Sequence, residues 1–281
     1  MQIGIVGLGL IGGSLAIDLK AKTPHKVTGV SRRQVVCDRA VELQIVDDAS
    51  VDFSSLEAAD LVVLCTPIQA IVSTAERLLP HLRADAVLTD VGSVKQPIVE
   101  HLAPLWPNFV GGHPMAGTAH QGLEAAVGNL FVDRPYVLTP SAATPTAAVE
   151  RLRQIIQPLG CVIYHCDPVI HDQAVAWISH LPVMVSAGLI SACTDADADV
   201  FRLAQAIASS GFRDTSRVGG GNPELGVMMA QHNRDNLLRS LQTYRQRLDQ
   251  LTDLIEQEDW QALEAALRQT QSDRPGFVSE L

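Results

Sequence analysis

Three glycines near the start of the chain are spaced so that they could bind the pyrophosphate of a dinucleotide. Gly7, Gly9 and Gly12 form the pattern G-x-G-x-x-G, after a short apolar run at 3–6 and before a stretch with helical character at 14–19. In this context the first glycine allows a tight turn, the second lets the backbone approach a pyrophosphate, and the third lets the helix pack against the strand. Because the helix N-terminus would face the anion, we expect dinucleotide binding and not a simple turn.

The end of the next predicted strand indicates which dinucleotide is bound. Residues 26–30 are expected to form that strand, and Ser31, Arg32 and Arg33 follow it. An NAD site usually carries Asp or Glu here to bind the ribose hydroxyls. This chain has no carboxylate to repel a 2′-phosphate, and two guanidiniums could pair with one. The arginines could instead be solvated charges at a helix start, but we favour NADP over NAD as the cofactor.

One histidine stands in a loop of the kind that often carries catalytic groups. His113 is preceded by two glycines and followed by Pro114, at the expected carboxyl end of a strand. A nicotinamide dehydrogenase needs a group that polarises or deprotonates the substrate hydroxyl, and a histidine has a pKa close to working pH. A histidine that only caps a backbone carbonyl is the alternative, and we favour the catalytic role. His165 and His171 lie near the expected domain junction and stay unassigned.

The composition limits the possible partners of the protein. The chain has 281 residues, enough for two domains, and a formal net charge of −10. We therefore expect no nucleic acid and no membrane as a partner. Five scattered cysteines without a C-x-x-C pair favour reduced thiols in the cytoplasm, with no metal site. The chain begins with the first predicted strand, so we expect no signal peptide.

Strands alternate with helices through residues 1–165, which predicts an α/β fold. We expect an N-terminal, Rossmann-type doubly wound sheet that forms a dinucleotide-binding domain. Its strands are expected at 3–6, 26–30, 59–65, 86–90, from 109, at 136–140 and at 161–164. The direction of the last strands is left open. Ligands of such sheets lie outside the carboxyl ends of the strands. The expected cofactor contacts are therefore Gly7, Leu8, Gly9, Leu10, Ile11, Gly12, Ser31, Arg32, Arg33, Thr66, Pro67 and Ser93.

The strand signals vanish in residues 166–281, which predicts an all-helical C-terminal domain for substrate binding and dimerisation. Helices are expected at 169–179, 181–191 and 200–208, with a further helix start at Asn222-Pro223. A heptad-like apolar stripe follows on a long helix, formed by Leu237, Leu241, Tyr244, Leu248, Leu251 and Ile255. The stripe favours a homodimer, with packing inside one subunit as the alternative.

Several motifs in one order resemble those of the TyrA family, the prephenate and arogenate dehydrogenases. The resemblance spans nearly the whole chain. The motifs are Asp90-Val91-Gly92-Ser93-Val94-Lys95, Gly112-His113-Pro114-Met115-Ala116-Gly117, Ser179-His180-Leu181-Pro182, Phe212-Arg213-Asp214-Thr215-Ser216-Arg217 and Asn222-Pro223-Glu224-Leu225.

The resemblance implies an enzyme that removes a hydride from C4 of a cyclohexadienol, with loss of the ring carboxylate as CO2. It implies that His113 accepts a hydrogen bond from the 4-hydroxyl and that Ser93 orients His113 beside the nicotinamide. It also implies that Arg217 clamps a substrate carboxylate and that His180 lines the pocket, as a polar contact or as a structural residue. From the residues alone, Ser93 could equally be a helix N-cap and Arg217 part of a surface ion pair.

Two departures from the family pattern bear on the substrate. Many relatives have a histidine where this chain has Val183, and a tryptophan where it has Gly226. A loop of three glycines that ends at Gly221 also lies next to Arg217, and its backbone could meet an amino-acid side chain. These features favour L-arogenate as the substrate and L-tyrosine as the product. The alternatives are a prephenate dehydrogenase that gives 4-hydroxyphenylpyruvate and, more remotely, a non-enzymatic NADP-sensing dimer.

Overall fold

The structure is a computed structural model, and it describes residues 1–118 and 120–278. The chain divides into two units, Met1–Asn233 and Arg234–Leu281. The first unit contains the whole sheet and the helices α1 to α10, while the second contains the long helices α11 and α12. The site described below belongs to the first unit.

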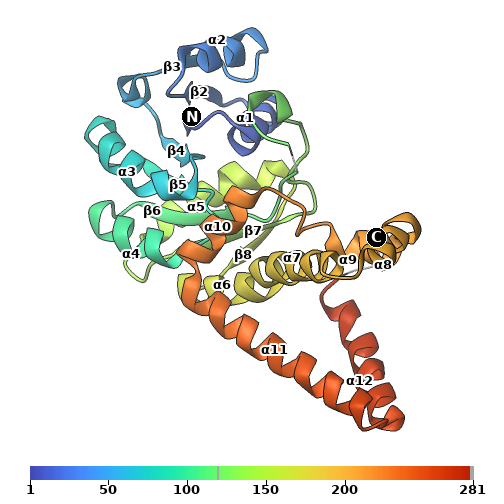
Figure 1. The fold of residues 1–281 in the computed structure, drawn as a ribbon. Helices are drawn as coiled ribbons and strands as arrows, with labels where there is room; N and C mark the ends of the chain where they lie inside the picture. Colours follow the sequence, from blue (N-terminus) through green and yellow to red (C-terminus); the bar gives the residue numbers. More distant parts are fainter. Residues whose placement is uncertain (119, 279–281) are drawn as a thin grey trace. The chain divides into compact units, whose positions relative to one another are not determined.

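One eight-stranded sheet is the frame of the first unit (Figure 1). Its order is β3-β2-β1-β4-β5-β6-β7-β8. All neighbouring strands are parallel except β6 and β7, which are antiparallel. The strands are β1 (Gln2–Val6), β2 (Lys26–Val30), β3 (Asp48–Ser50), β4 (Leu61–Leu64), β5 (Val87–Asp90), β6 (Phe109–Pro114), β7 (Pro135–Pro140) and β8 (Val162–His165).

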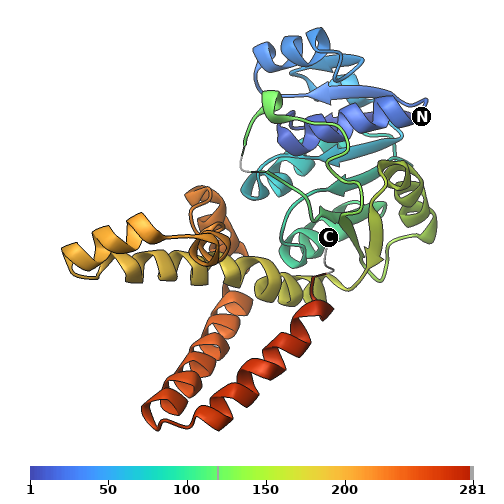
Figure 2. The same ribbon diagram turned by 90° about the vertical axis from the view of Figure 1, so that its right-hand side faces the viewer.

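Helices cover both faces of this sheet, which explains the unbroken apolar runs of the central strands. The four residues of β4, Leu-Val-Val-Leu, are all buried, as expected for a parallel strand covered on both faces. The blue helix α1 lies across the strands in Figure 2. The flanking helices are α1 (Leu10–Lys22), α2 (Gln34–Glu42), α3 (Ile68–Leu78), α4 (Gln96–Leu105) and α5 (Thr146–Ile156). One buried cluster includes residues of α1, α2 and α5, and a second includes residues of α3 and α4. The predicted Rossmann-type fold is therefore confirmed.

The chain changes direction across the sheet at β1, which pairs with β2 on one side and with β4 on the other. Such a switch point opens a crevice outside the carboxyl ends of the two strands. The predicted glycine motif follows β1 directly, and Thr66-Pro67 follows β4. The fold therefore brings two of the predicted cofactor segments to one place.

The structure adds one strand and settles two directions that the sequence left open. We expected no strand between residues 30 and 59, but residues 48–50 form the edge strand β3 beside β2. A strand of three residues is too short for its alternation to be recognised. β7 runs antiparallel to β6, and β8 runs parallel to β7. The strand that carries His113 is therefore one member of the antiparallel pair.

The two helices expected at 169–179 and 181–191 form one continuous run. It consists of α6 (Pro168–Val175), a turn of π-helix (Ala176–His180) and α7 (Leu181–Thr194). Pro182 explains the π turn, because a proline lacks an N–H and its ring crowds the carbonyl four residues earlier, which widens the helix there. The run Pro168–Thr194 is long and apolar enough to cross a membrane by length and composition alone. Its buried residues, however, include His171, Asp172 and His180, which belong to the site.

Three further helices complete the first unit, and two form the second. The first three are α8 (Ala198–Ile207), α9 (Ser210–Ser216) and α10 (Pro223–His232), and Asn222 caps α10 as expected. The second unit consists of α11 (Arg234–Glu256), which carries the predicted heptad stripe, and α12 (Trp260–Asp273), capped by Asp259. A domain boundary between 165 and 166 stays a prediction.

Candidate active site

The first part of the site is the backbone turn after β1, at the switch point of the sheet, and we call this segment, residues 7–12, the glycine crevice. Gly7 has φ +103°, and a Cβ there would lie 2.6 Å from the carbonyl oxygen of Cys65. A Cβ on Gly12 would collide with the carbonyl oxygen of Gly7. A Cβ on Gly9, by contrast, would meet nothing within 4 Å. The first and third glycines are therefore required by packing, while the second leaves the backbone open to a ligand.

The groups around this crevice suit a dinucleotide. No side chain caps the N-terminus of α1, whose first turn also lacks an acidic residue, so its N–H groups can receive a phosphate. The Thr66 hydroxyl oxygen is buried and has no hydrogen-bond partner among the described residues. A polar atom in this position is usually satisfied by a ligand or a water. The residues present therefore fit a bound dinucleotide.

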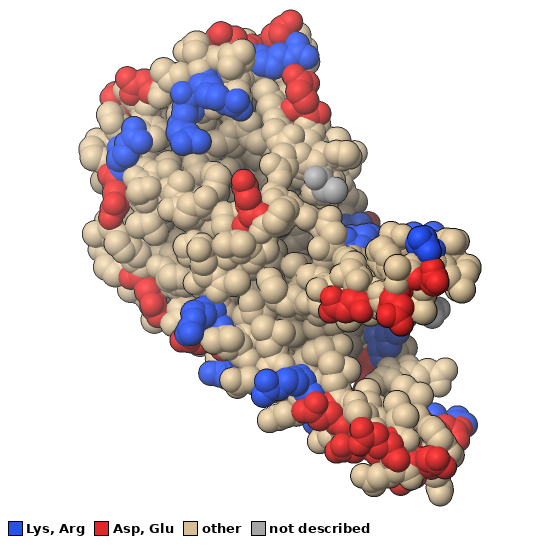
Figure 3. Space-filling view, in the orientation of Figure 1, with Lys and Arg blue, Asp and Glu red and all other residues tan. Residues whose placement is uncertain are grey.

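Ser31, Arg32 and Arg33 lie between the end of β2 and the start of α2. Both arginines are exposed, and neither guanidinium makes an ion pair or hydrogen bond within residues 1–118 and 120–278. Basic and acidic side chains are interspersed over the face in Figure 3, without a broad basic field. Any affinity for a phosphate at this point therefore has to come from these two local charges.

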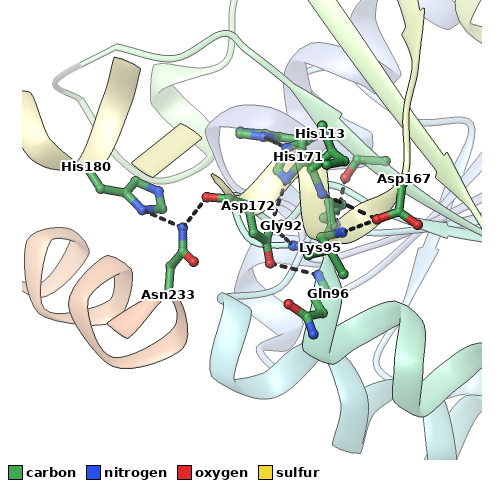
Figure 4. Close-up of polar contacts among 12 residues, drawn as sticks. Gly92, Lys95, Gln96, His113, Asp167, His171, Asp172, His180 and Asn233 are labelled. Carbon is green, nitrogen blue, oxygen red and sulfur yellow. Dashed lines mark hydrogen bonds and ion pairs between the residues drawn. The ribbon is translucent and has the colours of Figure 1, made fainter. Parts of the chain in front are cut away.

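The second part of the site is a group of buried side chains, which we call the histidine cluster: His113, His171, Asp172, His180 and Asn233 (Figure 4). His113 Nδ1 lies 2.8 Å from His171 Nε2. His171 Nδ1 lies 2.7 Å from Asp172 Oδ1. His113 comes from β6 and the other two from α6, which packs beside α4 and β7. A chain of three titratable groups thus starts at the predicted catalytic histidine.

A buried ion pair holds the strand that carries His113. The Lys95 ammonium donates to the Asp90 carboxylate and, at 2.8 Å, to the Gly112 carbonyl. Asp90 also accepts the N–H of Gly112 at 3.2 Å and that of Gly92 at 2.8 Å. Both charged side chains are fully buried. The pair therefore ties the end of β5 and the start of α4 to the residue just before His113.

The surroundings keep His113 neutral. Burial lowers its pKa well below the ordinary value, and the nearby His171, Lys95 and His180 lower it further by charge repulsion. The residue nevertheless retains a small exposed fraction of 8%. A neutral imidazole can accept a proton, which is what a general base must do.

His180 lies at the other end of the cluster, in the π turn. Its Nδ1 lies 3.2 Å from Asn233 Nδ2, which also donates to the Asp172 carbonyl at 2.7 Å. Burial lowers the pKa of His180 to about 4. Because the Asn233 amide nitrogen is a donor, Nδ1 of His180 accepts and Nε2 carries the hydrogen. That Nε2 is buried without a partner among the described residues, so it is available to a ligand acceptor.

Ser93, Arg217 and Gly221 are not joined to this cluster by any contact among the described residues. Ser93 is half-buried, and the hydrogen-bond partner of His113 Nδ1 is His171. Arg217 is exposed just after α9, and Gly221 is exposed before α10. The glycine loop is only partly open, because the N–H of Gly219 donates to Ser186 on α7 at 2.8 Å. The roles of these three residues stay predictions.

The sequence left His171 unassigned and gave no role to Asp172, Asn233 or Lys95. A histidine followed directly by an aspartate at a helix start was visible. Its partner His113, however, lies 58 positions away. Nothing in the local pattern indicates that two such distant segments pack together. The Asp-x-x-Ser-x-Lys motif did draw attention to Lys95, but not to its burial.

Two family models match the chain in consecutive segments. Residues 15–165 match the nucleotide-binding domain of prephenate dehydrogenase. Residues 167–269 match the dimerization domain of prephenate dehydrogenase. The first segment contains most of the sheet, and the second contains α6–α11.

Solved structures and a sequence relative agree with these matches. The chain is similar to Synechocystis arogenate dehydrogenase, with 57% identity, a TM-score of 0.91, and 99% of this chain and 100% of that one covered. Prephenate dehydrogenase from A. aeolicus, solved with hydroxyphenyl propionate and NAD+, gives 28% identity, a TM-score of 0.91 and coverage of 99% and 98%. Prephenate dehydrogenase from Bacillus subtilis is 32% identical over 279 residues, which are 97% of this chain and 75% of that protein.

Proposed function

The chain belongs to the prephenate dehydrogenase family, and within that family we propose that it converts L-arogenate to L-tyrosine with NADP. The observation that carries this proposal is the buried, neutral His113 at the carboxyl end of β6. The carboxyl ends of β1, β4, β5 and β6 share one edge of the sheet, because these strands are parallel. A base and a dinucleotide crevice on one edge suit hydride removal from a carbon that bears a hydroxyl.

In this reaction His113 accepts a hydrogen bond from the substrate 4-hydroxyl and takes its proton as C4 becomes a carbonyl carbon. When bound, the cofactor supplies the acceptor for the hydride that leaves C4. The bond to the ring carboxylate then breaks, CO2 leaves, and the electron pair makes the ring aromatic. The C4 oxygen recovers the proton from His113 and ends as a phenol. His113 therefore holds the proton only for the duration of the reaction.

The other predicted residues would bind and orient the substrate and cofactor. Arg217, exposed and without an ion-pair partner among the described residues, would clamp a substrate carboxylate with two parallel hydrogen bonds. Ser93 would lie near the nicotinamide, and the backbone at Gly221 would meet the amino-acid side chain. The unpartnered Nε2–H of His180 supports its role as a polar contact in the pocket.

The cofactor preference rests on the residues after β2. Ser31 occupies the place of the usual acidic residue, and the guanidiniums of Arg32 and Arg33 are unpaired within the described part of the chain. A 2′-phosphate placed there would gain two cations and meet no carboxylate. The A. aeolicus relative was solved with NAD+, so the preference for NADP is a proposal for this chain alone.

The proposed substrate preference rests on Val183 and Gly226, the two residues that differ from the family pattern and that lie close together in the fold. A Cβ on Gly226 would lie 3.7 Å from a methyl carbon of Val183. The positions where many relatives carry tryptophan and histidine are therefore neighbours, and here both residues are small and apolar. Neither offers the polar partner that a pyruvyl side chain would use. The 57% identity to an arogenate dehydrogenase supports the same choice.

Two alternatives to the proposed function stay open. Prephenate could be the substrate, with 4-hydroxyphenylpyruvate as product, since two of the similar proteins above are prephenate dehydrogenases. A non-enzymatic NADP-sensing dimer would bind the cofactor and have no use for His113.

We further propose a cytoplasmic homodimer assembled through the helical domain. The free cysteines are in keeping with the cytoplasm, and the exposed Trp177 and Ile178 are in keeping with a dimer interface.

The deciding experiment is NADPH formation by the purified protein with NADP and either L-arogenate or prephenate. We expect turnover with arogenate and little with prephenate. The opposite preference would keep the mechanism and overturn the argument from Val183 and Gly226. No turnover with either substrate, while NADP still binds, would favour the sensor.

A further inference from the structure

We propose that Asp172 and His171 form a positioning pair that sets the tautomer of His113 and shares its positive charge during the reaction. The inference deepens the proposed function, because it concerns the same base. It starts from three consecutive contacts (Figure 4). The backbone of α4 binds Asp172, Asp172 binds His171, and His171 binds His113.

Asp172 acts only as an acceptor, which determines the direction of the first hydrogen bond. Its Oδ1 accepts the backbone N–H of Lys95 at 2.7 Å, and its Oδ2 accepts that of Gln96 at 2.8 Å. These N–H groups belong to the first turn of α4, where the helix dipole favours a negative charge. The carboxylate is therefore ionised, and His171 Nδ1, at 2.7 Å from Oδ1, must be the donor.

The second hydrogen bond follows from the first. A neutral His171 that carries its hydrogen on Nδ1 has a lone pair on Nε2. His113 Nδ1, 2.8 Å from that atom, must then carry a hydrogen and donate it. His113 is left with a lone pair on Nε2, the nitrogen that does not take part in the cluster. This is the tautomer that can accept the substrate hydroxyl proton, so the pair presents the base in its reactive form.

The same contacts allow the positive charge that forms on His113 during the reaction to move to His171. When the O–H bond of the substrate breaks, its proton binds His113 Nε2. The hydrogen on His113 Nδ1 can then move to His171 Nε2. His171 becomes the cation, held against the Asp172 carboxylate, and His113 is neutral again. The transfers reverse when the phenol oxygen recovers its proton, so no proton is gained or lost overall.

Among the charged groups that the structure describes near the two histidine rings, Asp172 is the one that can stabilise a positive charge on them. The Lys95 ammonium is directed to Asp90 and to a backbone carbonyl, so those two charges offset each other. His180 faces Asn233 and is kept neutral by burial, which lowers its pKa to about 4. Asp172 and His171 are both almost fully buried. The carboxylate is thus the anion that can stabilise a cation formed on the two rings, and water does not screen it.

The first test measures the tautomer in the wild-type protein and needs no variant to fold. Histidines labelled with ¹⁵N report which ring nitrogen is protonated, and the His113 signals are identified by their loss in His113→Asn. At neutral pH we expect His113 to be protonated on Nδ1 and not on Nε2. Protonation on Nε2 would overturn the proposal, whether or not the protein turns over arogenate.

The second test compares two replacements of His171 by steady-state kinetics. In His171→Gln the amide oxygen can still accept from His113 Nδ1 but cannot bind the proton. In His171→Phe both functions are lost. We expect kcat to fall about 10- to 100-fold in His171→Phe, by analogy with residues that orient a metal-bound histidine. The fall should be smaller in His171→Gln, and KM for the substrate should be unchanged in both, since substrate binding uses other residues.

A matched control separates this role from general damage. His101→Gln makes the same exchange at an exposed histidine of α4, which pairs with Glu76, and should leave kcat at the wild-type value. If His171→Phe retains wild-type kcat, or if both His171 variants lose kcat equally with unchanged His113 spectra, the pair does not set the tautomer. NADPH binding, measured by nucleotide fluorescence, should be retained in every variant if the site is intact.

Discussion

The glycine crevice and the histidine cluster lie at the same edge of the sheet but are built in opposite ways. The crevice uses backbone within one short segment, 7–12, where two glycines meet carbonyl groups that leave no space for a side chain. The cluster uses side chains from β6, α6, the π turn and the residue after α10, and its central contact joins positions 58 apart. A local backbone motif is therefore readable in a sequence, whereas a side-chain network depends on how distant elements pack.

The two regions also differ in their exposure to water. Arg32 and Arg33 beside the crevice are exposed, while Asp172 in the cluster and the Lys95–Asp90 pair beside it are buried. Charges in water are screened, and their effect is modest. Charges in the dry cluster act strongly on each other and cost more when a partner is removed. Substitutions in the two regions should therefore have separable and unequal consequences.

The largest effect is expected from His113→Asn, which removes the proposed base and leaves the residues of the glycine crevice unchanged. We expect kcat to fall about 10²- to 10⁴-fold, the contribution of a positioned general base. NADP binding should be retained, because the glycine turn does not involve this side chain. Turnover and nucleotide titration measure the two parts separately. An unchanged kcat would contradict the assignment of His113 as the base.

The next effect is a loss of stability in Lys95→Met, which removes one partner of the buried pair under His113. Leaving the buried Asp90 without its cation should lower the free energy of unfolding by about 3–5 kcal/mol. Urea unfolding of the wild type and variant measures the difference. Lys20→Met, at the partly exposed pair with Asp47, serves as the control and should change the midpoint little. Equal shifts in the two variants would mean that burial does not set the strength of the Asp90 pair.

The pH dependence of stability should also originate in the cluster. The folded-state pKa of His180 is lowered from 6.5 to about 4, so unfolding takes up a proton between these values. Stability should therefore be lost as the pH falls through this range, by roughly 3 kcal/mol from His180. The lowered pKa of His113 acts in the same direction. Urea unfolding across this range should show a weaker dependence in His180→Gln, and an unchanged dependence would argue against a neutral buried His180.

The smallest effect is expected at the crevice, in Arg32→Ala. Loss of one charge-assisted contact to a 2′-phosphate corresponds to about 10- to 100-fold weaker NADP binding. NAD has no such phosphate, so its affinity should change little. Titration of the same protein with both nucleotides gives the ratio directly. Equal weakening of both would mean that Arg32 has no role in phosphate recognition.

Much of the fold could be predicted, because its signals are local. The buried runs at 61–64 and 87–90, the glycine turn and the Asn222-Pro223 helix start each depend on a few consecutive residues. The edge strand β3 could not be predicted, since three residues carry no recognisable alternation. The joining of α6 and α7 through a π turn was also missed. Pro182 was taken as part of a separate helix start, whereas the surrounding helix continues with one enlarged turn.

The sequence by itself determined the Rossmann-type sheet, the place of the dinucleotide crevice and the choice of His113 among nine histidines. These follow from backbone dihedral preferences and apolar periodicity, which act over a few residues. Only the tertiary structure decided that His171 and Asp172 stand behind His113, and that Lys95 and Asp90 hold the strand beneath it. Those partnerships arise because α6 packs beside α4 and the reversed strand β7. The contacts of His113 with His171, and of His171 with Asp172, form only once these distant segments pack together.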